Sequence, residues 1–219
     1  MAVSSINLDQ PGIWRILFPH ALKLMAHLEA QFSQVFWTFG GGTVLMLRIG
    51  HRQSKDIDLF LPDPQYLGYV NPRLSEVAEQ ISRDYEEGAE FIKLYLPEGE
   101  IDLVVGTALT DQPFDMVEHA GRTIRVETCA EIIAKKIWHR GDQAKARDLY
   151  DLCAVAEAEP SAIARATPFF ARHGAAFLKR LEERSELMEA EFQAIDAIGR
   201  PRSFAQSLAQ ARAIIQPLL

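Results

Sequence analysis

One stretch of the chain, residues 39–60, restricts the possible folds more than any other part of the sequence. The run 35–39 is rich in aromatic and β-branched residues, which predicts a short buried strand, and three glycines at 40–42 end it. Residues 43–49 then have the pattern of a short helix that ends at Gly50. Glycines between a strand and a helix let the backbone approach a ligand, and the free N–H groups of a helix start attract phosphate. This order therefore predicts a phosphate-binding turn.

The same stretch ends in an alternating pattern that predicts a second strand, at 55–62. A period of two places Asp56 and Asp58 on one face, about 7 Å apart at a rise of roughly 3.3 Å per residue. Asp102 lies on the polar face of another predicted strand, 100–106, and joins the pair if the two strands are neighbours in the sheet. Clustered carboxylates repel one another unless a cation neutralises them. Their hard oxygen atoms favour Mg²⁺ or Mn²⁺, ions that commonly bridge to nucleotide phosphates.

The rest of the chain divides into a mixed part and a helical part. Up to residue 127 the patterns predict a helix from near Pro19 to 31 with a turn of helix before it, a helix around 74–81, a hairpin of strands 90–96 and 100–106, and strands at 113–118 and 122–127. From Thr128, with Glu131 in a capping box, they predict helices over 128–139, through 149–156, and over 174–197 and 202–216. We therefore expect two domains, an α/β domain over 1–127 and a helical domain over 128–219.

Composition and charge narrow the class of protein. The 219 residues are 48% apolar and 24% charged, close to the average of soluble globular proteins, which argues against disorder. A formal charge of −7 argues against a general coat for nucleic acid or membrane. Two cysteines are too few for a disulfide framework. Because neither a secretory signal nor a membrane span is visible, we expect a cytoplasmic protein with no membrane partner.

Two distant motifs resemble a known family. The segment GGTVLMLRIGHRQSKDIDLF is similar to the AbiEii/AbiGii family of nucleotidyltransferase-like toxins, which is typified by Gly-Gly-Thr, an Arg-x-Ser pair and Asp-Ile-Asp-Leu. The later segment EIIAKKIWHRGDQAKARDLYDL, residues 131–152, resembles the lysine helix and the Arg-Asp-x-x-Asp motif of that family. The wider resemblance is to the nucleotidyltransferase fold shared with DNA polymerase β. It covers residues from about 35 to 155.

The resemblance implies a fold, a reaction and a role for particular residues. The fold class is α+β or α/β, a mixed sheet of the nucleotidyltransferase type with flanking helices, followed by a C-terminal helical lobe. The implied reaction uses an NTP and Mg²⁺ or Mn²⁺. The implied nucleotide-binding residues are Gly41, Gly42, Thr43, Arg52, Ser54 and Lys136; the implied catalytic residues are Asp56, Asp58, Asp102, Lys136, Asp148 and Asp151; and the implied metal ligands are Asp56, Asp58 and Asp102. Lys135 competes with Lys136, which we prefer because it directly precedes an apolar residue, as in the family pattern.

The family resemblance also implies a biological role. It predicts an enzyme that moves an NMP from an NTP to an acceptor hydroxyl, as the toxin of a bacterial toxin–antitoxin or phage-defence system. The implied acceptor is tRNA or another macromolecule, and the implied partner is a cognate antitoxin protein. Two alternatives stay open: an antibiotic-type nucleotidyltransferase that acts on a small molecule, and a nucleotide-binding module without turnover.

Basic residues gather near the second motif. The region 122–147 holds seven arginine and lysine residues against three acidic ones, an excess that can steer a nucleotide or an RNA end into a cleft. For any single member, a solvated helix face is the competing interpretation. His51 and His139 flank the predicted site without a distinctive spacing. Cys129 lies in the first turn of a predicted helix but has no positioned histidine partner, so we do not predict it to be a nucleophile.

Overall fold

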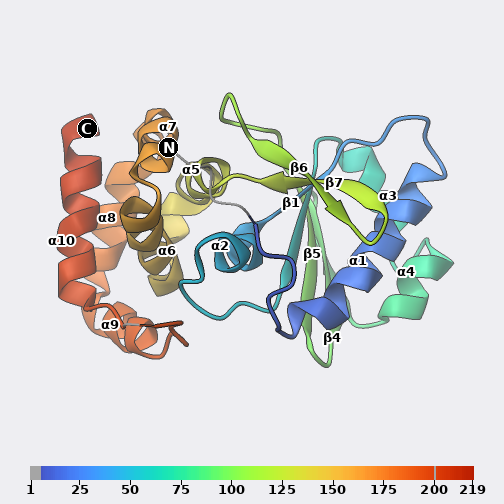
Figure 1. Cartoon of the computed structure of the whole chain (residues 1–219), viewed down its shortest axis with the longest axis horizontal. Coiled ribbons are helices and arrows are strands. Elements are labelled where there is room, and N and C mark those ends of the chain that lie inside the picture. Colours follow the sequence, from blue (N-terminus) through green and yellow to red (C-terminus); the bar gives the residue numbers. More distant parts are fainter. Residues whose placement is uncertain (1–5, 200) are drawn as a thin grey trace.

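The computed structural model describes residues 6–199 and 201–219 and contains one mixed sheet with helices on either side. Within the described residues the sheet has seven strands in the order β3-β4-β5-β2-β1-β7-β6. The strands are β1 (Thr38–Gly40), β2 (Ile57–Leu61), β3 (Tyr85–Glu87), β4 (Phe91–Leu96), β5 (Gly99–Val105), β6 (Phe114–His119) and β7 (Arg122–Glu127). Figure 1 shows the sheet in the middle of the molecule, between an N-terminal group of helices and a C-terminal one.

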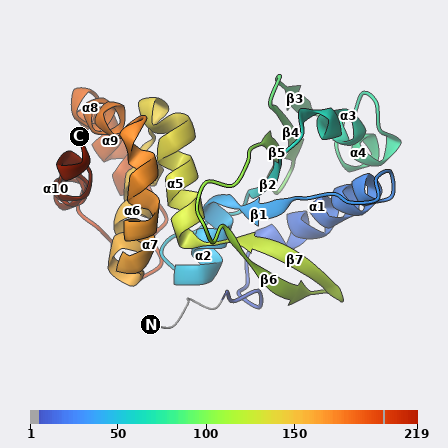
Figure 2. The same ribbon diagram turned by 90° about the horizontal axis from the view of Figure 1, so that it is seen from above.

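The helices fall into these two groups. The first comprises α1 (Trp14–Glu29), α3 (Leu67–Val70) and α4 (Glu76–Ile81). The second comprises α5 (Cys129–Arg140), α6 (Ala146–Ala158), α7 (Pro160–Ala166), α8 (Gly174–Glu183), α9 (Ser185–Gln193) and α10 (Phe204–Ile215). α2 (Gly41–Ile49) lies on the side of this second group, against α5 and α6, and seen from above the strands fan out from α2 and α5 (Figure 2). The predicted mixed sheet with a helical C-terminal part is therefore confirmed.

The two faces of the sheet differ in polarity. In β2 the side chains of Ile57, Leu59 and Leu61 are buried, whereas Asp58 and Phe60 point to the other face. The buried face packs on α1, where the ring of Phe18 stacks on Phe39 of β1 with centroids 4.6 Å apart. Burial of these apolar side chains supplies the main favourable free energy of folding. The opposite face is left to carry polar side chains near α5 and α6.

The register of the central strands confirms the predicted neighbours. β2 and β5 are parallel, and Asp58 pairs with Asp102 across them. β1 is antiparallel to β2 and parallel to β7, with Gly40 opposite Asp58 and Phe39 opposite Val126. Asp58 and Asp102 therefore lie side by side on the polar face, as the sequence predicts for neighbouring strands.

Three predicted boundaries are corrected. α1 begins at Trp14 and continues through Pro19, because burial of Trp14, Leu17 and Phe18 outweighs the backbone hydrogen bond that proline cannot make. The glycine run is not a loop: Gly40 ends β1, and Gly41 and Gly42 are the first residues of α2. The N-terminal strand is also shorter than the predicted 35–39 run, since β1 starts at Thr38.

The C-terminal helices also differ in part from the prediction. The helix predicted over 174–197 is two helices, α8 and α9, with a break at Arg184 that lets both bury apolar side chains. α7 was not predicted and begins at Pro160, a first-turn position that tolerates proline. Thr128 caps α5 by accepting from the Glu131 N–H, but the Glu131 carboxylate does not close the predicted capping box, because it binds Leu109 and Thr110 instead.

The strands end at Glu127, next to Thr128, so the change from mixed to helical structure falls where the sequence places it. The division into two domains at this residue stays a prediction. Among the described residues, no helix is both long enough and apolar enough to cross a membrane.

Candidate active site

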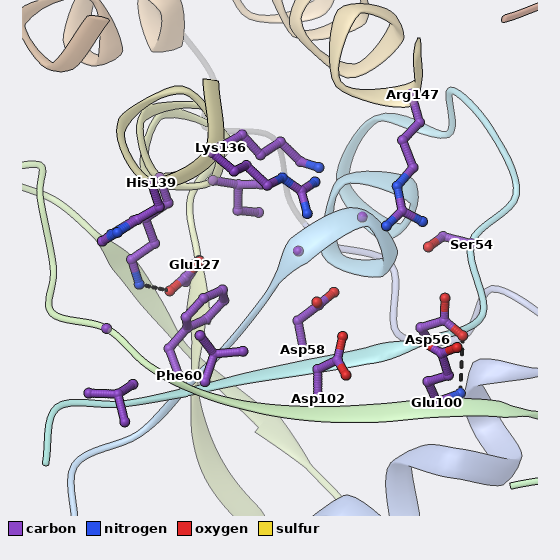
Figure 3. Close-up of a pocket in the computed structure, with 18 of the residues that line it drawn as sticks. Ser54, Asp56, Asp58, Phe60, Glu100, Asp102, Glu127, Lys136, His139 and Arg147 are labelled. Atoms are coloured by element: carbon purple, nitrogen blue, oxygen red, sulfur yellow. Dashed lines mark hydrogen bonds and ion pairs between the residues drawn. The ribbon is translucent and has the colours of Figure 1, made fainter. Parts of the chain in front are cut away.

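A pocket of about 310 Å³ lies between the polar face of the sheet and the helices α5 and α6. Figure 3 shows Asp58 and Asp102 in its middle, with Ser54, Asp56 and Arg147 to one side and Phe60, Glu127 and His139 to the other. We call the first side the cationic end, formed by Arg52, Ser54, Lys136, Arg140 and Arg147. We call the second the apolar end, formed by Phe60, Val104, Val105, Gly106, Glu127, Ile132 and His139. Of the residues predicted for the site, Gly41, Gly42, Arg52, Ser54, Asp56, Asp58, Asp102 and Lys136 line this pocket.

Asp58 and Asp102 form an acidic pair in the middle of the pocket. Burial raises the pKa of Asp58, and the cations Lys136, Arg140 and Arg147 oppose that effect. Burial, with a further contribution from the Asp58 charge, raises the pKa of Asp102 to about 7. Burial is the main cause of both shifts because it disfavours the charged form, and a neighbouring carboxylate adds to it: Asp56 for the pKa of Asp58, and Asp58 for the pKa of Asp102. Lys93 on β4 supplies part of that charge, with Nζ 3.3 Å from Asp102 Oδ1 and 2.7 Å from Glu100 Oε2.

Asp56 lines the same pocket but points away from this pair. It lies just before β2, and its Oδ1 accepts the backbone N–H of Glu100 at 3.1 Å. In Figure 3 its carboxylate lies beside Ser54 and Glu100. Asp56 and Asp58 therefore face one pocket, as their spacing predicts, yet only Asp58 lies next to Asp102.

The glycines at the start of α2 leave room that a side chain would fill. Gly41 has a φ of +72°, a conformation that favours glycine, and a Cβ there would overlap the Asp58 carboxylate. A Cβ on Gly42 would lie 2.7 Å from Arg52 Nη2 and 3.1 Å from Ser54 Oγ. The helix start is therefore packed directly against the acidic pair and the cationic end, where its first N–H groups have no helical partner.

Thr43 does not line the pocket. Its side chain is fully buried, and its Oγ1 lies 3.0 Å from Ser54 Oγ and 2.5 Å from the carbonyl oxygen of Asp56. Thr43 thus ties the start of α2 to the segment that carries Ser54 and Asp56. Through these contacts Thr43 holds Ser54 and Asp56 in place in the pocket wall, although its own side chain does not line the pocket.

Three cations of the pocket, Arg52, Lys136 and Arg140, are held by two buried aspartates of α6 that do not line it. Asp151 receives two hydrogen bonds from Arg52, from Nε at 2.6 Å and from Nη2 at 3.0 Å. Lys136 Nζ lies 2.9 Å from Asp148 Oδ1 and 3.1 Å from Asp151 Oδ2. Burial alone would raise the pKa of both aspartates, but Lys136 with Arg52 or Arg140 outweighs it and keeps each pKa below its usual range.

The two candidate lysines have different surroundings. Lys136 belongs to the aspartate network just described, at the cationic end. Lys135 Nζ instead lies 2.5 Å from Glu127 Oε1, 3.5 Å from Glu131 Oε1 and 4.0 Å from the centre of the Phe60 ring. Both line the pocket, but Lys136 shares the carboxylate of Asp151 with Arg52, whereas Lys135 is paired with Glu127.

A divalent cation fits the acidic pair together with a phosphate ligand. Among the described residues the buried Asp102 Oδ1 has only the 3.3 Å ion pair with Lys93 Nζ, and burial raises the pKa of both carboxylates, an effect that a cation would relieve. Among the same residues no three His, Cys, Asp or Glu side chains converge to hold a metal by themselves. Mg²⁺ is commonly held by one or two carboxylates plus substrate phosphates, so two protein ligands are sufficient.

Comparison with protein families identifies the chain. The family described as nucleotidyl transferase AbiEii toxin, type IV TA system, matches residues 23–213. The chain belongs to the AbiEii family. It is accordingly a nucleotidyltransferase, and the resemblance based on the two motifs is confirmed.

Solved structures similar to this AbiEii protein are remote. The antibiotic-resistance factor ANT(2'')-Ia is 15% identical, with a TM-score of 0.48 over 79% of this chain and 97% of that one. An antigenic nucleotidyltransferase-like protein from Paracoccidioides brasiliensis is 15% identical, with a TM-score of 0.41 over 85% and 95%. The CD-NTase CdnG from Bradyrhizobium diazoefficiens, solved with GTP, is 12% identical, with a TM-score of 0.38 over 97% and 86%. A comparison with curated proteins found no match.

Two residues of this site were not predicted from the sequence: Glu127, which lines the pocket, and Lys93, which pairs with the pocket residue Asp102. Glu127 is the last residue of β7 and lies beside Gly40 of β1, a contact that depends on the register of parallel strands. Lys93 faces Asp102 across β4 and β5, and that pairing was predictable from the hairpin turn at 97–99. The alternation in strand 90–96 offered a signal for Lys93, whereas nothing in the sequence marked Glu127.

Proposed function

We propose that this protein transfers a nucleotidyl group from an NTP to a hydroxyl group of an acceptor and releases pyrophosphate. The observation that supports it most is the Asp58–Asp102 pair, which lies between the glycine start of α2 and a cluster of cations. Helix starts and cations bind polyphosphate, and acidic pairs bind the divalent ion that accompanies it. A chain of the AbiEii family with this pocket has the parts that the reaction needs.

In this proposal the cationic end receives the triphosphate. Gly41 and Gly42 let the phosphates approach the N–H groups of α2, and Arg52, Ser54 and Lys136 contact their oxygens. Thr43, Asp148 and Asp151 act as positioning residues, because they orient these groups and do not reach the pocket. A bound divalent ion, held by Asp58 and Asp102 with Asp56 nearby, would neutralise charge on the phosphate oxygens.

The chemical step is a substitution at the α-phosphorus of the NTP. The acceptor oxygen forms a bond to this phosphorus, the bond between the α-phosphorus and the bridging oxygen breaks, and pyrophosphate leaves with those electrons. The acceptor oxygen gives up its proton, and we assign that proton to one of the carboxylates Asp56, Asp58 and Asp102, which face the same pocket.

The biological role proposed from the family is that of a toxin in a toxin–antitoxin or phage-defence system. The proposed acceptor is tRNA or another macromolecule, and the proposed partner is an antitoxin protein. We expect growth arrest when the chain is expressed without its partner, and normal growth for Asp58→Asn. Asp111→Asn, an exposed aspartate outside the pocket, should still arrest growth. Normal growth with folded wild-type protein would contradict the toxin role.

The acceptor is tested separately from the toxicity. Purified protein is incubated with Mg²⁺ and NTPs that carry a labelled α-phosphate, together with total tRNA or with a panel of small alcohols and aminoglycosides. Label in tRNA supports the proposed acceptor, whereas label in a small molecule supports the antibiotic-type alternative. NTP binding with no labelled product from any acceptor supports a binding module without turnover.

A further inference from the structure

One buried polar atom in the pocket plays no part in the proposed chemistry. Glu127 is 1% exposed, and its Oε1 accepts hydrogen bonds from Thr38 Oγ1 at 2.7 Å and from Lys135 Nζ at 2.5 Å. Its Oε2 has no hydrogen-bond partner among the described residues. A buried carboxylate oxygen without a donor is costly, so a site of this kind favours a ligand that supplies one.

The register of the sheet brings Glu127 to the wall of the pocket, with its Oε2 over Gly40. Asp102, Asp58 and Gly40 lie in one row across β5, β2 and β1, and Glu127 continues the row on β7. A Cβ on Gly40 would overlap Glu127 Oε2, so the absence of a side chain at Gly40 lets the carboxylate lie over β1. Glu127 therefore lies on the opposite side of Asp58 from Asp102, and Figure 3 shows it at the apolar end beside Phe60.

The two ends of the pocket match the two ends of a nucleotide. The cationic end holds Arg52, Lys136, Arg140 and Arg147, which suits a polyphosphate. The apolar end has the side chains of Phe60, Val104 and Ile132 in its wall, together with the carboxylate of Glu127. Lys135 adds no free positive charge there, because it is already paired with Glu127. A nucleoside is uncharged, largely flat, and carries N–H and O–H donors. Pockets for such groups are typically apolar with a few placed polar atoms.

We propose that Glu127 Oε2 accepts a hydrogen bond from the nucleoside part of the NTP, from a ribose hydroxyl or a base N–H, and so selects the donor nucleotide. This inference rests on the proposed function, because it takes the NTP as the ligand of the pocket. Thr38 and Lys135 hold the carboxylate in place through Oε1. Glu127 is thus a specificity residue that takes no proton in the transfer step.

The variant Glu127→Gln tests the proposal sharply. Thr38 and Lys135 both donate toward Oε1, so they orient the glutamine amide with its oxygen toward them and its NH₂ toward the pocket. The substitution then replaces an acceptor by a donor of nearly the same size at the Oε2 position. Glu118→Gln is the matched control, since it removes the same charge from an exposed position on β6.

Equilibrium binding is measured with α,β-methylene analogues of the four NTPs, with their deoxyribose forms, and with inorganic tripolyphosphate. We expect Glu127→Gln to weaken the best-bound nucleotide by about 10- to 100-fold. Its tripolyphosphate affinity should equal that of wild type, which also shows that the pocket is folded. A deoxy form that binds wild type and variant alike identifies a ribose hydroxyl as the donor group. If the deoxy forms still bind Glu127→Gln more weakly than wild type, and the size of this loss varies among the four bases, the donor is a base N–H.

Two results would overturn the inference while leaving the proposed function intact. One is a Glu127→Gln protein that binds every nucleotide as tightly as wild type does. The other is a variant that loses tripolyphosphate as well, since Glu127 would then support the whole pocket rather than its nucleoside end. Wild-type protein that binds no NTP would overturn the proposed function, and this inference with it.

Discussion

At the scale of single residues, the charge on Asp102 is set by two neighbours with opposite effects. Burial and Asp58 raise its pKa to about 7, whereas Lys93 lowers it through an ion pair of 3.3 Å. The same pairing, together with Glu100, raises the pKa of Lys93. Lys93 therefore acts as a built-in counter-ion next to a carboxylate that we propose to bind a metal. An ammonium group and a divalent ion near one carboxylate repel each other.

The first prediction follows from this competition. Lys93→Met should bind Mn²⁺ about 3- to 10-fold more tightly than wild type. The substitution removes a positive charge from beside Asp102, and at the pocket wall water screens the repulsion between that charge and the ion only in part. Titration followed by the magnetic resonance signal of free Mn²⁺ measures this without any turnover. Lys179→Met, an exposed change on α8, should match wild type. Weaker binding by Lys93→Met would mean that Lys93 holds Asp102 in its binding position.

The second prediction concerns stability and pH. A carboxylate whose folded pKa lies above its unfolded value destabilises the fold as pH rises from the unfolded to the folded pKa, because the unfolded chain ionises more easily. For Asp102 this range ends at about 7. Without metal, Asp102→Asn should therefore be more stable than wild type by about 1–3 kcal/mol at about pH 8 and nearly equal to it at about pH 4. Urea unfolding at both values measures this, and equal stability at the higher pH would contradict it.

The site residues were predictable where a local pattern or a family motif marks them. Asp58 and the glycines of α2 follow from a strand–helix–strand pattern, and Asp102 followed once its strand was placed. That Thr43 holds the triphosphate stays a prediction; its side chain donates to the carbonyl oxygen of Asp56 and does not line the pocket, an orientation that the periodicity of a short helix does not reveal. The position of Glu127 in the site depends on the parallel pairing of β7 with β1, two strands that are far apart in the sequence. Long-range register of this kind leaves no local mark.

At the scale of elements, the connection between α2 and β2 is held from the helical side. Arg52 and His51 both bind Asp151 of α6, and His51 Nε2 lies 2.8 Å from Asp151 Oδ1. The backbone of the connection also pairs with the segment after α9, through Gln53 N to Asp196 O at 2.7 Å and Ile198 N to His51 O at 3.0 Å. Arg52 and Asp151 belong to two separate sequence motifs, and in the structure the Arg52 guanidinium donates two hydrogen bonds to the Asp151 carboxylate.

The third prediction tests this contact. Asp151→Asn should lower the free energy of unfolding by about 3–5 kcal/mol, because it removes the carboxylate that pairs with buried Arg52 and leaves Lys136 with Asp148 alone. The Asp151 pKa lies well below its usual range, so this contribution is present at neutral pH and is lost only as pH falls through that low value. Denaturant unfolding measures the change, with the exposed Asp196→Asn as a control. A loss below about 1 kcal/mol would contradict the interpretation.

At the scale of the whole molecule, the chain is acidic, whereas basic side chains gather at one end of its pocket. The chain carries −7 in total, whereas four arginine and lysine side chains gather at the cationic end. Arg147 is the member with no hydrogen bond or ion pair to another described residue, although its charge lowers the pKa of Asp58. A local positive field within an acidic protein attracts an anion to one place only.

The fourth prediction uses that free arginine. Arg147→Gln should weaken tripolyphosphate binding by about 3- to 30-fold and reduce its dependence on salt, because one charge-assisted contact and its field are lost. The melting temperature should stay unchanged, since the side chain has no described partner in the fold. Arg83→Gln, an exposed change near α4, serves as the control. Unaltered tripolyphosphate affinity would place the phosphates away from α6.

The central claim is that one pocket holds an NTP between the glycine start of α2 and the Asp58–Asp102 pair. A crystal structure of the protein with an α,β-methylene NTP and Mg²⁺ tests it most directly. We predict the triphosphate against Gly41 and Gly42, the ion on Asp58 and Asp102, and the nucleoside toward Phe60. A nucleotide bound elsewhere, or a triphosphate with no ion on either aspartate, would contradict the account.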